Sequence, residues 1–252
     1  MKEVQVKNLI FNNGNTKICV PLINETLELY RNSLYKLKNI DHDLIELRID
    51  YFKDVEDFDK VIILLKEIRN LYNKPILFTF RTKKEGGIHE LSEDKYFKLN
   101  NTVIRSKLID IVDIELSSSI EEINKTIALA HYNNVKVIIS NHDFIKTPSK
   151  QELINKFLEM QKFDGDISKI AVMANCEEDV LTLLEASLEM KKYKATKPFI
   201  IMSMGSLGVI TRLTGELFGS CMTFAALEKT SAPGQINVTH ARELLNLLSI
   251  KN

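Results

Sequence analysis

One lysine stands inside a largely apolar segment, residues 166–173, which reads DISKIAVM. If this segment is a strand, Lys169 shares a face with Ile167 and Ala171, because strand side chains alternate between two faces. An ammonium in such surroundings must be paired, or it loses part of its proton affinity and becomes a nucleophilic amine. The other alternative is a lysine whose head reaches water from the end of the strand.

Further charged residues stand in or just after short apolar runs of the same kind. They are Glu46, Arg48, Arg81, Asp113, Glu115 and His142. Charges inside a barrel are costly unless they pair with each other or with a ligand. A single Glu–Arg pair could be a structural ion pair. Charges contributed by five successive strands are better explained by a functional site, because active sites of barrel proteins collect residues from the ends of many strands. The pattern therefore favours a site to which many strands contribute.

These residue types suit covalent catalysis on a carbonyl compound. A partly desolvated lysine can form an imine with a ketone. His142, which follows a strand-like run, can move protons near pH 7, although such a histidine gains a catalytic role only from Lys169. Arg48, Arg81 and Arg212 can bind carboxylate and hydroxyl oxygens. The expected substrate is a small, anionic, oxygen-rich ketone.

The elements that must position these residues alternate along the chain. Residues 4–9 and 17–22 flank Asn-Asn-Gly-Asn, which predicts a hairpin leading into the first core strand. Helical patterns then alternate with strand-like runs, and the clearest helix has one apolar stripe between residues 58 and 71. The predicted core strands cover residues 17–22, 43–50, 75–80, 111–116, 135–140, 166–173, 199–204 and 222–224.

Eight strand–helix units in 252 residues predict a closed (β/α)8 barrel. A doubly wound open sheet is the structural alternative, but no Gly-rich dinucleotide turn follows the first strand. No linker rich in Pro, Gly or Ser marks a boundary, so we expect residues 1–252 to form a single domain.

The amino-acid composition limits the classes of molecule that this protein is expected to bind. Lys plus Arg equals Asp plus Glu at 34 each, so no overall charge attracts nucleic acid or an anionic membrane. The apolar runs are too short to cross a bilayer, and the first residues have no hydrophobic segment of the signal-peptide type. Three distant cysteines without CxxC spacing argue against a disulfide framework and a zinc site. We expect a cytoplasmic protein that acts on a small molecule.

Several short motifs, taken in order and with their spacing, resemble those of the type I 3-dehydroquinate dehydratases, lyases of the shikimate pathway. The matching stretches are Glu46-Leu-Arg48-Ile-Asp50, Phe80-Arg81-Thr82, Glu85-Gly86-Gly87, Ser140-Asn-His142-Asp-Phe144, Lys169-Ile-Ala-Val-Met173, Met202-Ser-Met204-Gly205, Arg212-Leu, Phe218-Gly-Ser220, Thr223-Phe224 and Ser231-Ala-Pro-Gly-Gln235. Each is ordinary alone, whereas their joint order is specific.

The resemblance implies a (β/α)8 barrel whose bottom is closed by an N-terminal β-hairpin, and usually a homodimer. It implies that Lys169 forms an imine with 3-dehydroquinate, that His142 is the general acid/base, and that Glu85 supports His142. It also implies a set of substrate-binding residues, namely Glu46, Arg48, Arg81, Met202, Arg212, Ser231 and Gln235. Neither a metal nor an organic cofactor is expected.

Two other functions remain open at this stage. A class I aldolase also places an imine-forming lysine in a barrel, but the sequence has no convincing phosphate cradle after strands seven and eight. A non-catalytic sensor of a shikimate-like acid would be expected to lack an intact Lys–His pair. Formation of a conjugated enoate from 3-dehydroquinate separates the dehydratase from both alternatives.

Overall fold

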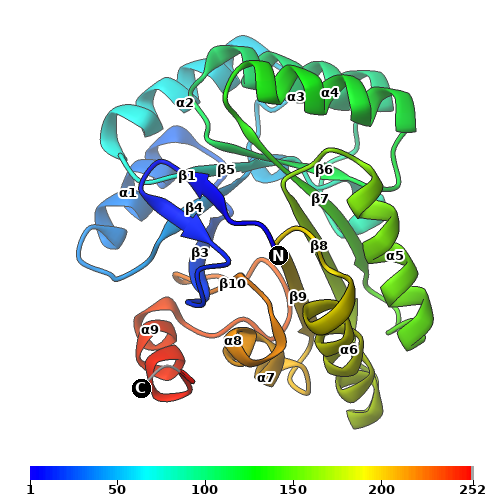
Figure 1. Ribbon diagram of the computed structural model, residues 1–252. Helices are drawn as coiled ribbons and strands as arrows, with labels where there is room; N and C mark the ends of the chain where they lie inside the picture. The colour runs from blue at the N-terminus through cyan, green and yellow to red at the C-terminus, as the bar shows by residue number, and fades with distance from the viewer. Residues whose placement is uncertain (251–252) are drawn as a thin grey trace.

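The computed structural model describes residues 1–250, and its main sheet consists of eight parallel strands in the order β10-β3-β4-β5-β6-β7-β8-β9. The strands are β3 (Lys17–Leu22), β4 (Leu44–Arg48), β5 (Ile76–Thr79), β6 (Ile111–Glu115), β7 (Lys136–Asp143), β8 (Ile167–Met173), β9 (Phe199–Met204) and β10 (Met222–Phe224). Cys221 N donates to Phe199 O at 2.9 Å, so the last two strands nearly close the ring (Figure 1). The predicted barrel is confirmed.

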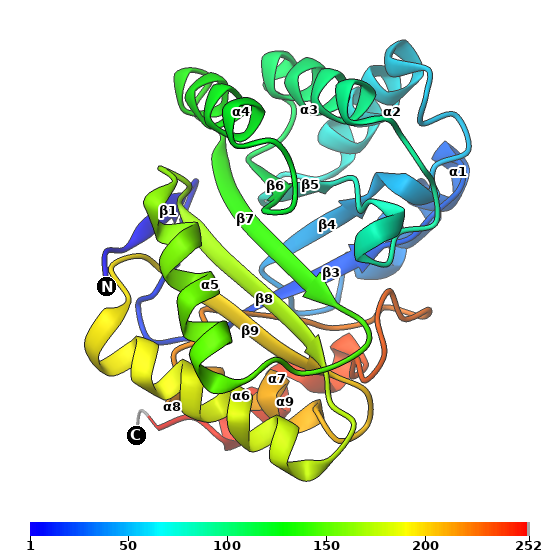
Figure 2. The same cartoon turned by 90° about the vertical axis from the view of Figure 1, so that its right-hand side faces the viewer.

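Helices surround the barrel and alternate with its strands. They are α1 (Leu27–Leu37), α2 (Phe58–Leu71), α3 (Glu93–Ser106), α4 (Ile120–Tyr132), α5 (Lys150–Lys162), α6 (Glu177–Glu189), α7 (Val209–Leu213), α8 (Gly215–Phe218) and α9 (Val238–Leu247). Figure 2 shows α5 and α6 lying over the outer face of β8 and β9. Among residues 1–250, no helix has the length and apolar character needed to cross a membrane.

Local sequence signals set the helix boundaries. The side chain of Asp57 accepts from Lys60 N and caps α2, while Val61, Leu65 and Ile68 form its buried stripe. The burial of this stripe against the sheet supplies most of the stability of such a helix, because isolated helices of this length are marginal in water.

Side chains along each strand alternate between two sides of the sheet, and they form one core inside the barrel and another between the sheet and the helices. On β4, Ile45 and Leu47 pack in the apolar layer between sheet and helices, whereas Glu46 and Arg48 point into the barrel. On β8, Ile167 and Ala171 belong to the interior cluster that Lys169 adjoins, as the period of two predicts. The barrel interior is therefore apolar toward the strand beginnings and charged toward their carboxyl ends.

An N-terminal hairpin covers the barrel bottom. It consists of β1 (Val4–Val6) and β2 (Leu9–Phe11), paired antiparallel through a two-residue turn in which Lys7 has φ 53°. Val4 and Phe11 pack in the interior cluster with the first residues of several core strands, and Figure 1 shows the hairpin across the near opening.

The prediction that residues 4–9 pair with residues 17–22 in this hairpin is wrong. Lys17–Leu22 is the first barrel strand, and its two edges are taken by parallel β4 and β10. The partner of β1 is β2 instead, and the Asn-Asn-Gly-Asn turn connects the hairpin to the barrel. A strand with a neighbour on each side has no free edge for a third, so the hairpin must form within residues 4–11.

Candidate active site

A small cavity of about 30 Å³ lies at the carboxyl ends of the strands, which is where barrel proteins place their sites. Its lining residues are Glu46, Arg48, Arg81, Glu85, His142, Phe144, Lys169, Ala171, Met202, Met204, Phe224, Ser231, Ala232 and Gln235. All of the predicted catalytic and substrate-binding residues except Arg212 belong to this lining, whereas Asp113 and Glu115 lie outside it. A cavity of this volume holds about one water molecule, so it must widen before it can hold a substrate.

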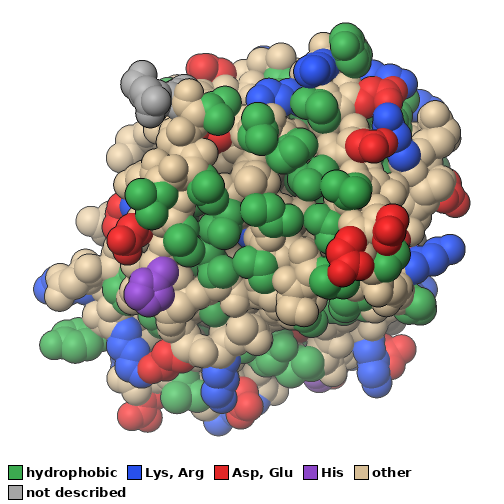
Figure 3. Space-filling model, turned by 90° about the horizontal axis from the view of Figure 1, so that it is seen from below, with side chains coloured by type: hydrophobic (Ala, Val, Ile, Leu, Met, Phe, Trp, Pro, Cys, Tyr) green, Lys and Arg blue, Asp and Glu red, His purple; other side chains and the backbone are tan. Residues whose placement is uncertain are grey.

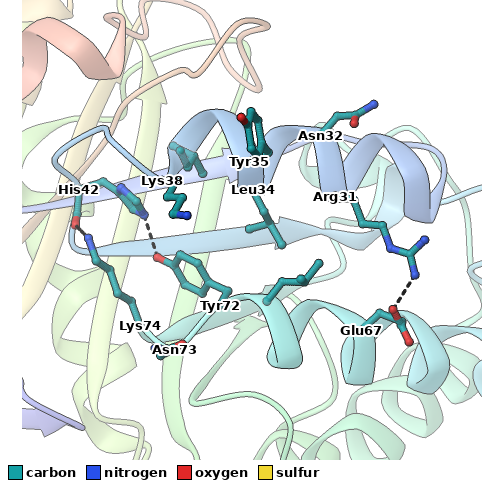
Figure 4. A pocket seen from close by; sticks show the side chains of 12 residues that line it. Arg31, Asn32, Leu34, Tyr35, Lys38, His42, Glu67, Tyr72, Asn73 and Lys74 are labelled. Atoms are coloured by element: carbon teal, nitrogen blue, oxygen red, sulfur yellow. Dashed lines mark hydrogen bonds and ion pairs between the residues drawn. The ribbon is translucent and has the colours of Figure 1, made fainter.

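A larger hollow of about 760 Å³ lies elsewhere, between α1 and α2 (Figure 4). Its polar groups bond to one another: His42 Nε2 lies 2.9 Å from Tyr72 Oη, and Lys74 Nζ donates to His42 O at 2.7 Å. Arg31 is paired with Glu67 at 2.6 Å. None of the predicted site residues reaches it, so we place the active site at the barrel mouth.

Lys169 is buried, with 4% of its surface exposed. Its Nζ atom lies 3.2 Å from Asp113 Oδ2, 3.9 Å from Glu46 Oε1 and 4.6 Å from the centroid of the Phe224 ring. The Lys169 amine is therefore buried and paired with a carboxylate, and it does not reach water from the end of the strand. The pairing holds the nitrogen at a fixed place in the floor of the cavity.

His142 lies one layer nearer the barrel mouth than Lys169, on the neighbouring strand. In the β7–β8 register, Ser140 is opposite Lys169 and His142 is opposite Ala171. The sequence placed His142 just past a strand ending at residue 140, which is wrong, because β7 continues to Asp143. The longer strand fixes the backbone of His142 in the sheet and turns its side chain toward the cavity.

Glu85 holds the imidazole from behind. Its Oε2 atom lies 2.8 Å from His142 Nδ1 and accepts from His142 N at 3.1 Å. Glu85 ends a short 3₁₀ turn, Lys83–Glu85, and Gly86 follows it with φ 88°, a conformation that favours glycine. Since Nδ1 is occupied by Glu85, Nε2 is the imidazole nitrogen left to meet a ligand.

Burial shifts the proton affinities of this pair. It raises the pKa of Glu85 to about 7, and the charge of Glu115 adds to the rise. Burial lowers the pKa of His142 well below its usual value, and the positive charges of Arg81 and Lys169 act in the same direction. The imidazole is therefore neutral at pH 7 and able to accept a proton.

Arg81 fixes the carboxylates around the amine. Its guanidinium lies 2.8 Å from both Asp113 Oδ1 and Glu115 Oε1, and it donates to Ser140 Oγ at 3.0 Å. Burial alone would raise the pKa of Asp113, but the charges of Arg81 and Lys169 hold it below its ordinary value. Asp113 is thus an anion shared between two cations.

Arg48 and a loop segment form the roof of the cavity. Arg48 donates to both carboxylate oxygens of Asp50 at 2.9 Å, and its Nη1 atom reaches Ser231 O at 3.5 Å. Gln235 Nε2 donates to Ser231 Oγ at 2.9 Å, and Ser231 N donates to Gln235 Oε1 at 2.8 Å. These bonds hold the segment together at the edge of the cavity, and the Arg48 contact links it to the barrel.

Arg212 lies behind the cavity wall instead of in it. It belongs to the short helix α7, which follows β9, and is 1% exposed. One terminal nitrogen donates to Pro233 O at 2.9 Å, the other lies 3.8 Å from Met202 Sδ, and Nε has no partner. Burial lowers the pKa of Arg212 to about 10, so it remains a cation at neutral pH.

The charge of Arg212 is not matched by a carboxylate among residues 1–250, whereas Arg48 and Arg81 each have at least one. A buried, unmatched cation is costly, and an anionic ligand would offset that cost. The structure also shows contacts to which the sequence analysis assigned no role, such as Asp50 with Arg48 and Thr79 with Glu46. In the predicted strand 43–50, Asp50 shares a face with Arg48, which is the one sequence signal for that pair, although the structure places Asp50 in the 3₁₀ turn Ile49–Tyr51 that follows β4.

The family model described as type I 3-dehydroquinase matches residues 18–252. The chain belongs to this family. It is 49% identical over 249 residues to 3-dehydroquinate dehydratase of Clostridium novyi (strain NT), and the match covers 98% of each chain. It is 47% identical over 249 residues to 3-dehydroquinate dehydratase of Listeria monocytogenes serotype 4a (strain HCC23), again over 98% of each.

Solved structures of type I 3-dehydroquinase family members are similar in fold. The crystal structure of type I 3-dehydroquinate dehydratase from Clostridium difficile with covalent modified comenic acid has a TM-score of 0.95 and 45% identity, over 98% of each chain. That of the Geobacillus kaustophilus HTA426 enzyme has a TM-score of 0.94 and 35% identity, covering 100% of this chain and 98% of the other. These matches confirm the predicted family and enzyme class, a carbon–oxygen lyase of the type I 3-dehydroquinate dehydratase kind.

Proposed function

We propose that this chain dehydrates 3-dehydroquinate to 3-dehydroshikimate through an imine on Lys169, with His142 as the general acid/base. The observation that carries the proposal is the arrangement of Lys169 and His142 in one small cavity, on neighbouring strands and one layer apart. An amine in the floor and an imidazole nearer the mouth can act on adjacent carbons of the same substrate.

The proposed reaction has three stages. The Lys169 amine attacks the C3 ketone and loses water, which gives a protonated imine. The imine draws electrons and acidifies the adjacent C2 hydrogen, which moves as a proton to His142 Nε2. His142 then protonates the C1 hydroxyl as it leaves as water, and hydrolysis of the imine releases the product and restores Lys169.

Arg212 is the proposed partner of the substrate carboxylate. It carries the buried positive charge that no side chain of residues 1–250 neutralises, and it lies directly behind Met202. A guanidinium binds a carboxylate through two parallel hydrogen bonds, and the second of these would occupy a donor that now lacks a good acceptor. We propose that Met202 packs against the substrate ring beside this contact.

The remaining predicted residues are proposed to hold the substrate hydroxyls. Glu46 accepts from Thr79 Oγ1 at 2.8 Å and keeps further acceptor capacity toward the cavity. Arg48, Ser231 and Gln235 form the roof, and their polar groups would exchange their present bonds for bonds to the substrate. Arg81 would act mainly by holding the carboxylates near the amine.

Covalent chemistry in a relative supports the imine. The similar Clostridium difficile enzyme was crystallised with covalent modified comenic acid. We expect neither a metal nor an organic cofactor to be needed, because the lysine imine itself supplies the electron sink for C2 deprotonation.

An absorbance assay for the conjugated enoate tests the reaction. We expect the wild type to convert 3-dehydroquinate, and Lys169→Ala to be inactive while keeping its circular-dichroism spectrum. Borohydride reduction during turnover should attach the substrate skeleton at Lys169. An adduct on Lys136 or Lys146 instead would contradict the assignment, and a silent wild type would return the aldolase and sensor alternatives to consideration.

We also propose that two copies of the chain associate through one apolar face. Figure 3 shows apolar side chains gathered over the face formed by α6, α7, α8 and α9. Its exposed members are Leu181, Leu207, Ile210, Leu217, Leu247, Leu248 and Ile250. A patch of this kind on one monomer is typical of an interaction surface, and its mixed-charge rim suits pairing with a second copy.

Sedimentation velocity tests this homodimer. Leu247→Glu places a charge in the apolar face and should give a monomer. Ile63→Glu changes an exposed side chain on α2, away from that face, and should leave the dimer intact. A wild type that sediments as a monomer would contradict the proposal.

Two further expectations are kept as proposals. Residues 1–252 form one domain, which is supported by a sheet whose strands come from the whole range between residues 17 and 224. The protein works in the cytoplasm, which is supported by the free state of Cys19, Cys176 and Cys221. Limited proteolysis and cell fractionation, respectively, test them.

A further inference from the structure

Asn141 links the active site to the outer layer of helices. In the β7–β8 register it is opposite Ile170, which packs in the apolar layer between sheet and helices. On that side, Lys156 of α5 donates to Asn141 Oδ1 at 2.6 Å. The Nδ2 atom of the same amide lies 3.4 Å from Glu85 Oε1. A half-buried lysine outside the cavity is therefore two contacts away from the carboxyl group that holds His142.

Lys156 determines which way the amide of Asn141 points. An ammonium has donors only, so the amide atom beside Lys156 Nζ must be the oxygen. The NH2 group of Asn141 then faces Glu85 and donates to it. Without a cation at this place the amide could turn over, and its oxygen would then repel the carboxylate.

Three further contacts of Glu85 are with groups that can donate a hydrogen bond. Ser117 Oγ lies 2.8 Å from Oε1, His142 N donates to Oε2 at 3.1 Å, and Arg81 Nη1 lies 3.7 Å from Oε2. An ionised carboxylate only accepts, so this set of donors favours the anion. Beside an anion, His142 Nδ1 at 2.8 Å carries the hydrogen and Nε2 keeps its lone pair.

Charged and titratable groups act on Glu85 from each element that packs against it. They are Arg81 after β5, Asp113 and Glu115 of β6, His142 of β7 and, through Asn141, Lys156 of α5. Burial and the two acidic residues oppose ionisation, Arg81 and the hydrogen bond from Ser117 favour it, and together they raise the pKa of Glu85 to about 7. Because the carboxyl group titrates near neutral pH, the loss of one donor changes its charge there.

We propose that Asn141, oriented by Lys156, is a positioning residue that keeps Glu85 ionised and His142 in the tautomer that can accept a proton at Nε2. The value of this tautomer to the reaction rests on the proposed dehydration. The hydrogen bonds themselves exist in the free protein, so they can be measured without turnover.

Nuclear magnetic resonance of full-length protein labelled with nitrogen-15 at histidine tests the arrangement. The ring signals of His142 are assigned by their absence in His142→Ala. In the wild type, the Nδ1 signal should change with a midpoint near pH 7, where Glu85 becomes neutral. A wild type without this change would overturn the inference.

Asn141→Asp is the most direct variant. It keeps the shape and still accepts from Lys156, but it replaces the donor to Glu85 with a second carboxylate. The midpoint should rise by at least about one pH unit, which is a tenfold change in proton affinity. Lys156→Met frees the amide and should raise the midpoint by less, whereas Lys156→Arg supplies another cation with donors only and should keep the wild-type midpoint.

Asn155→Asp is the matched control, because it makes the same chemical change at an exposed position of α5, where the side chain bonds Gln151. Its midpoint should equal that of the wild type. An unchanged midpoint in Asn141→Asp, or an equal rise in Asn155→Asp, would overturn the inference.

The pH dependence of kcat is the second measurement. At pH 7, kcat of Asn141→Asp should fall by up to about fivefold with an unchanged KM, because a smaller fraction of Glu85 is ionised. It should recover above the new midpoint, whereas a distorted site would stay slow at every pH and would overturn the inference. A wild type that shows the expected titration but does not dehydrate 3-dehydroquinate would overturn the proposed function instead.

Discussion

His142 and Lys169 are separated by one layer of the barrel, and each has its own carboxylate partner. Asp113 lies 3.2 Å from the Lys169 amine, whereas Glu85 lies 2.8 Å from the His142 imidazole. The two groups that we propose as catalytic therefore do not depend on each other for their position. This separation allows imine formation and elimination to be tested apart.

His142→Ala should still form an imine but eliminate water slowly. The groups that hold the amine, Asp113 and Glu46, remain in this variant. Elimination needs a base for C2 and an acid for the hydroxyl, and each such group typically contributes about 100- to 10,000-fold. Mass spectrometry with 3-dehydroquinate should show an adduct that has not lost the second water. Turnover near the wild-type rate would make His142 structural and Glu85 the leading acid/base candidate.

The rate should fall in two steps on the acid side of neutrality. The first step is partial and lies near pH 7, where Glu85, whose pKa burial raises to about 7, becomes neutral and no longer stabilises the imidazolium. His142 must be neutral to accept the C2 proton, and burial together with Arg81 holds the pKa of His142 well below 6.5, so the second step should lie below that pH. In Glu85→Gln the first step should be absent, and a first step that persists there would contradict its assignment to Glu85. A stopped assay across pH 5 to 9 measures the profile.

Glu85→Gln should slow the reaction and shift the decline of kcat on the acidic side of the pH profile, where His142 becomes charged, to a lower pH. The carboxylate stabilises the imidazolium when it is ionised, so its loss lowers the proton affinity of His142. We expect kcat to fall by about 100-fold with little change in KM, since a general base contributes about that much. A variant with an unchanged kcat would show that the 2.8 Å contact has no part in proton transfer.

Arg81→Met should destabilise the fold. It leaves Glu115 buried without its cation and Asp113 with Lys169 alone, and removing one partner of a buried ion pair costs about 3–5 kcal/mol. Arg31→Met is the matched control, because the Arg31–Glu67 pair is largely exposed and such pairs contribute at most about 1 kcal/mol. Urea unfolding of both variants measures the difference. Equal midpoints would mean that the interior network contributes no stability.

Periodic patterns in the sequence predicted the barrel and the face of Lys169. Strand alternation is local, and eight segments of it determine which residues of β4 and β8 point inward. The hairpin was wrongly paired for the opposite reason. The choice between β2 and β3 as partner of β1 depends on which strand edges the closed barrel leaves free, and no local pattern contains that information.

The side-chain contacts inside the site also could not be predicted from the sequence. The motifs indicated that Arg81 and Arg212 belong to one site, but not that Arg81 is surrounded by carboxylates while Arg212 has none. That difference arises from β5, β6 and α7, which are distant in the chain and meet only after folding. Ser117 was missed because one serine in a turn carries no sequence signal of its contact with Glu85.

Arg212→Lys should weaken substrate binding selectively. Lysine keeps the charge but loses the planar fork, because its three N–H donors diverge from one nitrogen and cannot form two parallel bonds to a carboxylate. We expect kcat/KM to fall by about 10- to 100-fold, which corresponds to the loss of one charge-assisted hydrogen bond of about 1.5–3 kcal/mol. Arg242→Lys is the matched control, because Arg242 forms its ion pairs with Asp41 and Asp43, away from the cavity.

The same variant distinguishes a carboxylate clamp from a structural role. With a substrate analogue whose carboxylate is replaced by an amide, wild type and Arg212→Lys should have nearly equal dissociation constants, because the fork no longer has an anion to bind. If Arg212 has a purely structural role, Arg212→Lys should weaken the binding of both ligands equally, because it would distort the cavity for each. If Arg212→Lys left kcat/KM for 3-dehydroquinate unchanged, the carboxylate would have to bind elsewhere, and Arg48 at the roof would be the next candidate.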